Sequence, residues 1–247
     1  MTLEKFFREN PRAAVAFSGG VDSAYLLWAA RQCGADIRAY YVKTQFQPAF
    51  ELADAQRLAR EIGVPMTVLR QDALASEAVA QNPADRCYYC KQGIFTGILQ
   101  AAAADGYTLV LDGTNASDDA GDRPGMRALR ELRVRSPLRE CGLSKDEIRA
   151  RSRQAGLFTW KKPAYACLAT RIPTGQRITA GLLGKIERAE DFLFSLGFTD
   201  FRVRILSGCA RLQLPAEQMS QAIEQRGAIL RELGPLFGGV LLDLKER

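Results

Sequence analysis

The sequence predicts an α/β domain built on a parallel sheet, followed by a smaller α+β domain. Over residues 1–172, short apolar stretches of strand length alternate with segments of helical periodicity, which is typical of parallel strands joined by helical crossovers. Beyond that point two strand-like stretches follow each other directly between helices, as in an antiparallel hairpin. We therefore expect two domains, at 1–172 and 173–247.

The elements of the first domain follow from this alternation. A Gly-rich turn opens the first crossover helix, and Ser144 with Glu147 forms the pattern of a capping box. Ligands of such sheets bind at the carboxyl ends of the strands. The expected elements are a short N-terminal amphipathic helix, strands at 13–17, 37–42, 66–69 and 108–112, an extended piece at 134–138, helices around 25–28 and at 49–62, 94–104 and 144–156, and a flexible loop at 122–125.

A stretch without periodicity, at 160–175, separates the two compositional halves. The second half has a helical pattern that ends at Gly197, then two strands and a further helix, so we expect a hairpin packed against helices. Its expected elements are helices at 180–196 and 216–233 and strands at 201–206, 211–214 and 240–244.

Composition limits the chemistry. The chain has 247 residues, of which 47% are hydrophobic and 25% charged, as in proteins that bury a core. It has no apolar run of membrane-spanning length and no signal-peptide core at its start, so we expect a cytoplasmic protein without membrane contact. The net charge of +6 suits a phosphorylated small molecule as well as RNA. Because histidine is absent, imidazole bases and His-ligated metals are excluded, and a metal would need cysteine or carboxylate ligands.

A Gly-rich stretch between the first strand and its helix has the features of a phosphate-binding loop. In Ser18-Gly19-Gly20-Val21-Asp22-Ser23, two glycines let the backbone bend close to an anion, two hydroxyls add donors, and the helix start provides N–H groups. The Walker pattern is excluded because its spaced second glycine and its Lys-Ser/Thr pair are missing, and the dinucleotide fingerprint is absent as well. The alternative, a plain Gly turn, needs neither the serines nor the aspartate.

Two cysteine motifs carry the other chemical signals. Cys87-Tyr-Tyr-Cys90 at a helix start turns two thiols to one side, which suits metal chelation or dithiol chemistry, although two reduced, half-buried cysteines could share that spacing by chance. Cys167 lies among small residues between Lys161-Lys162 and Arg171, and cationic neighbours favour a thiolate and attract phosphate. The remaining cysteines are expected to pack in periodic or capping contexts: Cys33, Cys141 and Cys209.

Taken in order along the chain, these motifs resemble a known family. The loop at 18–23 resembles the PP-loop of ATP pyrophosphatases, the adenine nucleotide alpha hydrolase-like enzymes that split ATP into AMP and pyrophosphate while adenylating a substrate oxygen. With the later segments the chain resembles the LarE family, ATP-dependent sulfur transferases that build the nickel-pincer cofactor of lactate racemase. Those segments are Asp112-Gly-Thr-Asn115, Asp118-Asp119, Arg123-Pro-Gly125, Cys167-Leu-Ala-Thr-Arg-Ile-Pro173 and Phe201-Arg-Val-Arg204.

The resemblance implies a reaction and its cofactors. ATP would adenylate a carboxylate of pyridinium-3,5-biscarboxylic acid mononucleotide, and sulfur would then displace AMP to leave a thiocarboxylate. Some members give up the sulfur of one cysteine and work once, whereas others carry three cysteines that look able to hold a [4Fe-4S] cluster with one iron open to an exchangeable sulfide. With Cys87, Cys90 and Cys167 the chain resembles the second group, and a structural zinc site would want a fourth ligand. Family members also form symmetric oligomers, so a homo-oligomer is expected.

By position, the resemblance assigns roles to further residues. The three cysteines and Asp22 would be catalytic. ATP phosphates would be held by the loop residues Ser18, Gly19, Gly20, Asp22 and Ser23, with Gly113 near the nucleotide. The substrate's phosphate or carboxylates would face Thr170, Arg171, Glu190, Arg202 and Arg204.

Several alternatives stay open. Arg202 and Arg204 share a strand face that could simply be the solvent face, and Asp118-Asp119 would either bind Mg²⁺ or cap the following loop. A tRNA thiolase uses the same adenylation and a similar three-cysteine cluster, but the small basic excess and the lack of an obvious RNA-binding module disfavour a nucleic acid partner. A nucleotide-binding module with a structural Cys site is the non-enzymatic alternative.

Overall fold

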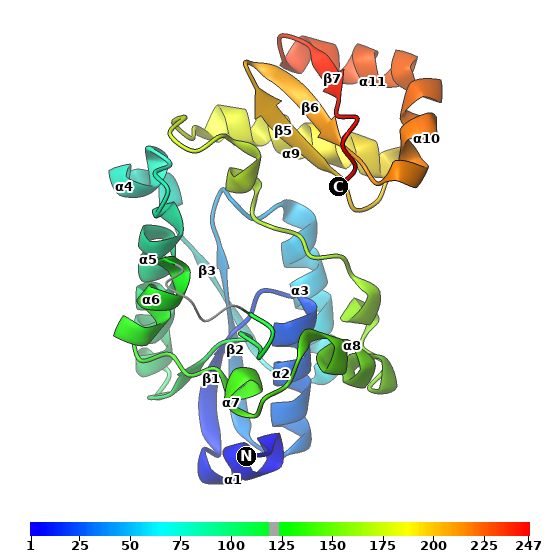
Figure 1. Cartoon of the computed structure of the whole chain (residues 1–247). Helices are drawn as coiled ribbons and strands as arrows, with labels where there is room; N and C mark the ends of the chain where they lie inside the picture. Colours follow the sequence, from blue (N-terminus) through cyan, green and yellow to red (C-terminus); the bar gives the residue numbers. More distant parts are fainter. Residues whose placement is uncertain (119–123) are drawn as a thin grey trace. The chain divides into compact units, whose positions relative to one another are not determined.

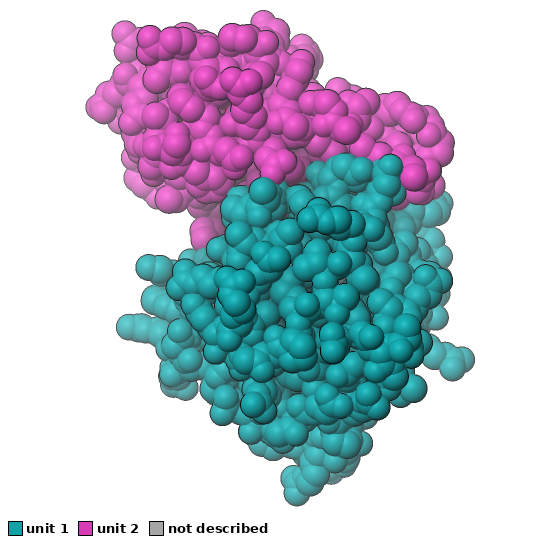
Figure 2. Space-filling model, turned by 180° about the vertical axis from the view of Figure 1, so that it is seen from behind, with its two compact units in different colours: residues 1–73, 85–162 teal, residues 74–84, 163–247 magenta. Residues whose placement is uncertain are grey.

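The computed structural model describes residues 1–118 and 124–247, and the chain divides into two compact units (Figure 2). Unit 1 comprises residues 1–73 and 85–162, and unit 2 comprises residues 74–84 and 163–247. The units therefore do not follow the expected division at residue 172. The irregular stretch around Cys167 belongs to unit 2, and so does a segment that the sequence places inside the first domain.

Unit 1 contains a four-stranded parallel sheet with the order β3-β2-β1-β4. The strand order reverses beside β1, so the segments that follow β1 and β4 leave the sheet at a topological switch point, where open α/β sheets bind ligands. This confirms the expected parallel sheet. The strands are β1 (Arg12–Ala16), β2 (Asp36–Lys43), β3 (Met66–Arg70) and β4 (Val110–Leu111).

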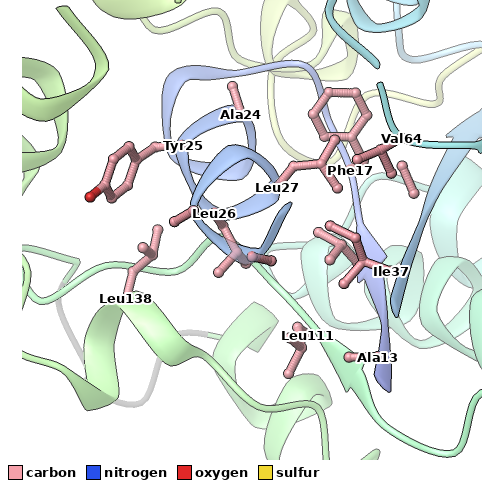
Figure 3. Packing of buried hydrophobic residues seen from close by; sticks show 14 of the residues in the cluster. Ala13, Phe17, Ala24, Tyr25, Leu26, Leu27, Ile37, Val64, Leu111 and Leu138 are labelled. Atoms are coloured by element: carbon pink, nitrogen blue, oxygen red, sulfur yellow. The ribbon is translucent and has the colours of Figure 1, made fainter. Parts of the chain in front are cut away.

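Helices cover both faces of this sheet (Figure 1). Helix α2 forms the centre of one layer, where Leu26 and Leu27 pack among residues of the sheet and of neighbouring segments, including Ala13, Ile37 and Leu111 (Figure 3). No helix among the described residues is both long and apolar enough to cross a membrane. One layer contains α1 (Leu3–Glu9), α2 (Val21–Gln32), α3 (Ala49–Ile62), α7 (Pro137–Glu140) and α8 (Lys145–Gln154), and the other contains α5 (Arg86–Ala104) and α6 (Pro124–Glu131).

Most expected elements of unit 1 are present, but several differ in extent. The loop expected at 122–125 is wrong in its second half, because Pro124 and Gly125 begin α6; Pro is well tolerated in the first turn of a helix. Residues 122 and 123 lie outside the described residues. The extended piece at 134–138 is reduced to one bridge at Arg135 before α7, and a short 3₁₀ helix, η2 (Phe158–Lys161), follows α8.

Unit 2 is built on a three-stranded sheet with the order β5-β6-β7. The expected antiparallel hairpin is confirmed by β5 and β6, and β7 pairs parallel to β6. The single helix expected at 216–233 is wrong: it divides at Gln225, which allows Ala222, Ile229 and Leu233 all to reach one core. The elements are η3 (Leu168–Arg171), α9 (Ala180–Ser195), β5 (Arg202–Leu206), β6 (Cys209–Gln213), η4 (Ala216–Gln218), α10 (Met219–Glu224), α11 (Arg226–Leu233), η5 (Gly234–Leu236) and β7 (Val240–Leu242).

Contacts of Asn82 help to join residues 74–84 to the rest of unit 2. This segment contains α4 (Glu77–Ala80), and it follows η1 (Ala73–Ala75), which begins in unit 1. The fully buried Asn82 amide donates to the carbonyl of Pro173 at 2.8 Å and to that of Gln176 at 3.2 Å, and the Asn82 carbonyl accepts from Gly175 N at 2.8 Å. These bonds tie residues 74–84 to the chain that follows Cys167.

Candidate active site

The loop after β1 has the geometry of an anion cradle. Gly19 adopts φ +74°, and a Cβ there would lie 3.0 Å from the Ala55 Cβ on α3, so glycine is required both for the backbone conformation and for the packing. The hydroxyls of Ser18 and Ser23 lie 3.1 Å apart, and Ser23 Oγ accepts from Ser18 N at 3.3 Å. Gly20 is the N-cap of α2, whose first N–H groups have no partner within the helix. The loop therefore places hydroxyls and a helix N-terminus together, as phosphate binding requires.

The segment after β4 packs directly against this helix start. Asp112 is buried, and its carboxylate accepts from Ser136 Oγ at 2.6 Å and from the Thr114 hydroxyl at 2.5 Å. A Cβ at Gly113 would lie 2.8 Å from Ser23 N and 3.1 Å from Ser23 Cα. Because the obstructing atoms are backbone, only glycine fits between β4 and the start of α2.

Replacing Gly113 with alanine is therefore expected to push the two segments apart. Overpacking of this kind typically costs about 1–3 kcal/mol, so we expect a lower melting temperature and about tenfold weaker ATP binding. Calorimetric titration and thermal unfolding would measure the two effects. Gly93→Ala is the matched control, because a Cβ there meets nothing within 4 Å and alanine favours the helix. Unchanged ATP affinity in Gly113→Ala would show that this contact does not shape the nucleotide site.

Asp22 connects the loop to two distant segments. Its carboxylate accepts from Lys145 Nζ at 2.5 Å and from Asn115 Nδ2 at 3.3 Å. Sequence reasoning missed Lys145: the capping box places it at the first position of α8, but no local pattern shows that its side chain reaches α2. An anionic carboxylate repels phosphate, so Asp22 can serve ATP only through a cation, and Lys145 is a cation observed beside it. The Lys145 ammonium, held by Asp22, is therefore a cation at the mouth of the loop.

Asp118 closes the turn that carries Asn115. Its carboxylate accepts from Asn115 N at 2.9 Å, and Asn115 Oδ1 accepts from Ser117 N at 2.8 Å, so Asp118 stabilises the turn before it. The loop that it was expected to cap follows it and lies outside the described residues. Asp119 lies outside the described residues. A magnesium ion at this pair stays a proposal.

Cys87 and Cys90 lie in the first two turns of α5 in unit 1. Cys87 is exposed and Cys90 half-buried, neither is in a disulfide, and three positions separate them along the helix, which places them on neighbouring turns of one face. The buried Arg86 guanidinium lies 3.8 Å from Cys87 Sγ. Both thiols are therefore suitable metal donors, although no group of three or more Cys, Asp or Glu side chains that could hold a metal is found among residues 1–118 and 124–247.

Cys167 belongs to unit 2, where it caps η3. Its carbonyl accepts from Thr170 N at 2.9 Å and from Thr170 Oγ1 at 2.8 Å, so the turn holds the cysteine backbone on one side. Lys162, expected to be a cationic neighbour of Cys167, belongs to unit 1 and pairs with Asp54 of α3 at 2.7 Å. Within unit 2, the cations that contact residues 164–171, the Cys167 segment, are arginines.

Arg171, Arg202 and Arg204 converge on this segment from η3 and β5. Arg202 is only 5% exposed, so the solvent-face interpretation is wrong for it, and Arg204 is half-buried. Burial lowers the pKa of both the Arg202 and the Arg204 guanidinium, and the charge of Arg171 lowers it further. Arg171 forms a fully buried ion pair with Glu190, with Nε 2.8 Å from Oε1. Arg202 also lies 4.0 Å from the Asp200 carboxylate, so these three guanidiniums face two carboxylates and leave excess positive charge, which favours an anionic ligand.

The fold and the loop define a PP-loop ATP pyrophosphatase, and comparisons with known proteins identify the family. The asparagine synthase family matches residues 4–156. The chain is 32% identical over 246 residues to the pyridinium-3,5-bisthiocarboxylic acid mononucleotide synthase of Lactiplantibacillus plantarum, covering 98% of this chain and 89% of that protein. It is 39% identical over 223 residues to an uncharacterized protein of Synechocystis, covering 90% and 83%. The tRNA-specific 2-thiouridylase of Streptomyces griseus is 31% identical over 194 residues, but the match spans only 51% of that enzyme.

The chain belongs to the LarE family of ATP-dependent sulfurtransferases.

Proposed function

We propose that this chain converts pyridinium-3,5-biscarboxylic acid mononucleotide to its thiocarboxylate in the synthesis of the nickel-pincer cofactor. The observation that carries the proposal is the anion cradle with the Lys145 ammonium at its mouth, in a chain that aligns along almost its whole length with a mononucleotide synthase of this kind. The thiouridylases align over about half of their own length, which favours a small substrate over tRNA.

In the activation step, a carboxylate oxygen of the mononucleotide attacks the α-phosphorus of ATP. The bond between the α-phosphorus and the oxygen that bridges it to the β-phosphate breaks, and pyrophosphate leaves with the electron pair. Negative charge develops on the departing pyrophosphate. The hydroxyl of Ser18, the N–H groups at the start of α2 and the Lys145 ammonium would stabilise this charge, with Asp22 fixing Lys145. A magnesium ion would add to the same stabilisation.

In the transfer step, a sulfur nucleophile attacks the acyl carbon, and AMP leaves with the electron pair of the broken C–O bond. Cys87, Cys90 and Cys167 would supply the thiolates of a [4Fe-4S] cluster, and three thiolate ligands would leave one iron without a protein ligand. When bound, such a cluster would hold an exchangeable sulfide on that iron. The excess of guanidinium charge around the Cys167 segment would hold the phosphate and the second carboxylate of the mononucleotide.

The test is pyrophosphate release from ATP with the mononucleotide as the added substrate and no tRNA. We expect release that depends on the mononucleotide, and a product that gains sulfur in place of oxygen by mass spectrometry. Release only with tRNA would favour a thiolase. No ATP cleavage with either substrate would favour the nucleotide-binding module without enzyme activity.

A further inference from the structure

Glu190 is saturated by contacts inside unit 2. Its Oε1 accepts from Arg171 Nε at 2.8 Å and from Val203 N at 2.9 Å. Its Oε2 accepts from Arg171 Nη2 at 3.0 Å and from the Tyr165 hydroxyl. A carboxylate has about four lone-pair sites, and these four donors occupy them. With 1% of its surface exposed, Glu190 has neither access nor acceptor capacity for a substrate.

Each of the three arginines also holds a backbone carbonyl in the Cys167 segment. Arg171 Nη1 donates to the Ala166 carbonyl at 2.9 Å, and Arg204 Nη1 donates to the Thr170 carbonyl at 2.8 Å. Arg202 Nη2 donates to the Ala164 carbonyl. The arginines therefore hold the backbone on both sides of Cys167. They bind the carbonyl of the preceding residue and the carbonyls three residues before and three residues after the cysteine.

Tyr165 joins these parts. Its hydroxyl donates to Glu190, and its ring lies 4.7 Å from the Arg171 guanidinium carbon and 5.1 Å from that of Arg202. Cation–π contacts of this kind are attractive at these distances. Because Tyr165 is two residues before Cys167, any loosening of its ring or hydroxyl acts on the cysteine backbone directly.

We infer that Tyr165 and Glu190 are positioning residues for Cys167, acting through Arg171, and are not substrate ligands. Glu190 orients Arg171, and Arg171 holds the Ala166 carbonyl. The Tyr165 hydroxyl, two residues before Cys167, provides a further hydrogen bond to the Glu190 carboxylate. Their importance for sulfur transfer rests on the proposed function, but the ordering of the Cys167 segment does not.

The experiment uses Tyr165→Phe in the full chain, which keeps the ring and removes the hydroxyl. We expect amide hydrogen exchange in residues 164–171 and alkylation of Cys167 by iodoacetamide, both resolved by peptide mass spectrometry, to become about tenfold faster, as loss of a hydrogen bond to a charged group predicts. Tyr107→Phe is the matched control, because it removes a phenol-to-carboxylate bond to Asp36 in unit 1. Neither readout requires ATP or the mononucleotide, so failure of the proposed function would leave them intact.

Glu190→Gln separates positioning from substrate binding. If Glu190 is a positioning residue, we expect faster amide hydrogen exchange in residues 164–171 of the variant. We also expect a lower kcat for sulfur transfer with an unchanged KM for the mononucleotide. A raised KM with unchanged exchange and alkylation would instead make Glu190 a ligand and overturn the inference. If Glu190→Gln does not fold, because Arg171 is left buried without its partner, Tyr165→Phe decides alone: exchange and alkylation equal to those of Tyr107→Phe would overturn the inference.

Discussion

Alanine at Asp22 is expected to lower ATP-dependent pyrophosphate release by about a hundredfold to a thousandfold, the range seen when one charge-stabilising group is lost from an active site. The carboxylate holds the Lys145 ammonium and the Asn115 amide at the phosphate loop, so its loss releases both. The fold should survive, because side chains of the pair are 22% and 32% exposed and such pairs contribute about 1 kcal/mol or less. A coupled pyrophosphate assay and thermal unfolding would measure the two quantities.

A double-mutant cycle with Asp22→Asn and Lys145→Met shows through which cation Asp22 acts. If Asp22 serves mainly to hold Lys145, the second substitution adds little to the loss of activity caused by the first, because both substitutions disrupt the same ion pair. If Asp22 acts instead through magnesium, the two losses multiply. Wild-type pyrophosphate release in both single variants would exclude the pair from the activation step.

The fold was predictable where local signals and burial agree. Helix α3 has the expected bounds, because an apolar stripe runs between Pro48 at its start and Gly63 at φ +75° at its end. The division of the helix expected at 216–233 was not predictable, since apolar spacing reports which residues face the core and does not report a bend that lets them reach it. The same holds for residues 74–84, whose place in unit 2 depends on contacts with residues about 90–100 positions further along the chain, such as those of Asn82 with Pro173 and of Glu77 with Arg177.

The candidate site was likewise predictable from the sequence only in part. The phosphate loop was predictable because strand, glycines, hydroxyls and helix start are contiguous in the chain. The pair of Lys145 with Asp22 joins residues 123 positions apart, and only the topology that brings the start of α8 to α2 creates it. For Glu190 the sequence could give the residue type but not the count of donors around it, which is what distinguishes a positioning residue from a ligand.

Serine at Cys87, Cys90 or Cys167 is expected to remove most of the iron from the anaerobically reconstituted protein, which should hold about four irons per chain. In the proposed cluster each thiolate would supply one of three protein ligands, so each loss should also lower sulfide-dependent multiple turnover by a hundredfold or more. Iron and sulfide analysis would measure the cluster. Cys33→Ser is the matched control: burial and the charge of Glu4 raise the pKa of the Cys33 thiol, which disfavours the thiolate that binds iron, so the iron content should not change.

The same variants distinguish a cluster from a sacrificial cysteine. Cys87 and Cys90 belong to unit 1 and Cys167 to unit 2, so a mechanism that consumes only the Cys167 sulfur has no use for the unit 1 pair. In that case Cys87→Ser and Cys90→Ser would complete one turnover at the wild-type level, and Cys167 would lose the mass of one sulfur atom. If the cluster carries the sulfur, Cys167 keeps its mass after many turnovers, and all three serine variants fail in the transfer step while still releasing pyrophosphate.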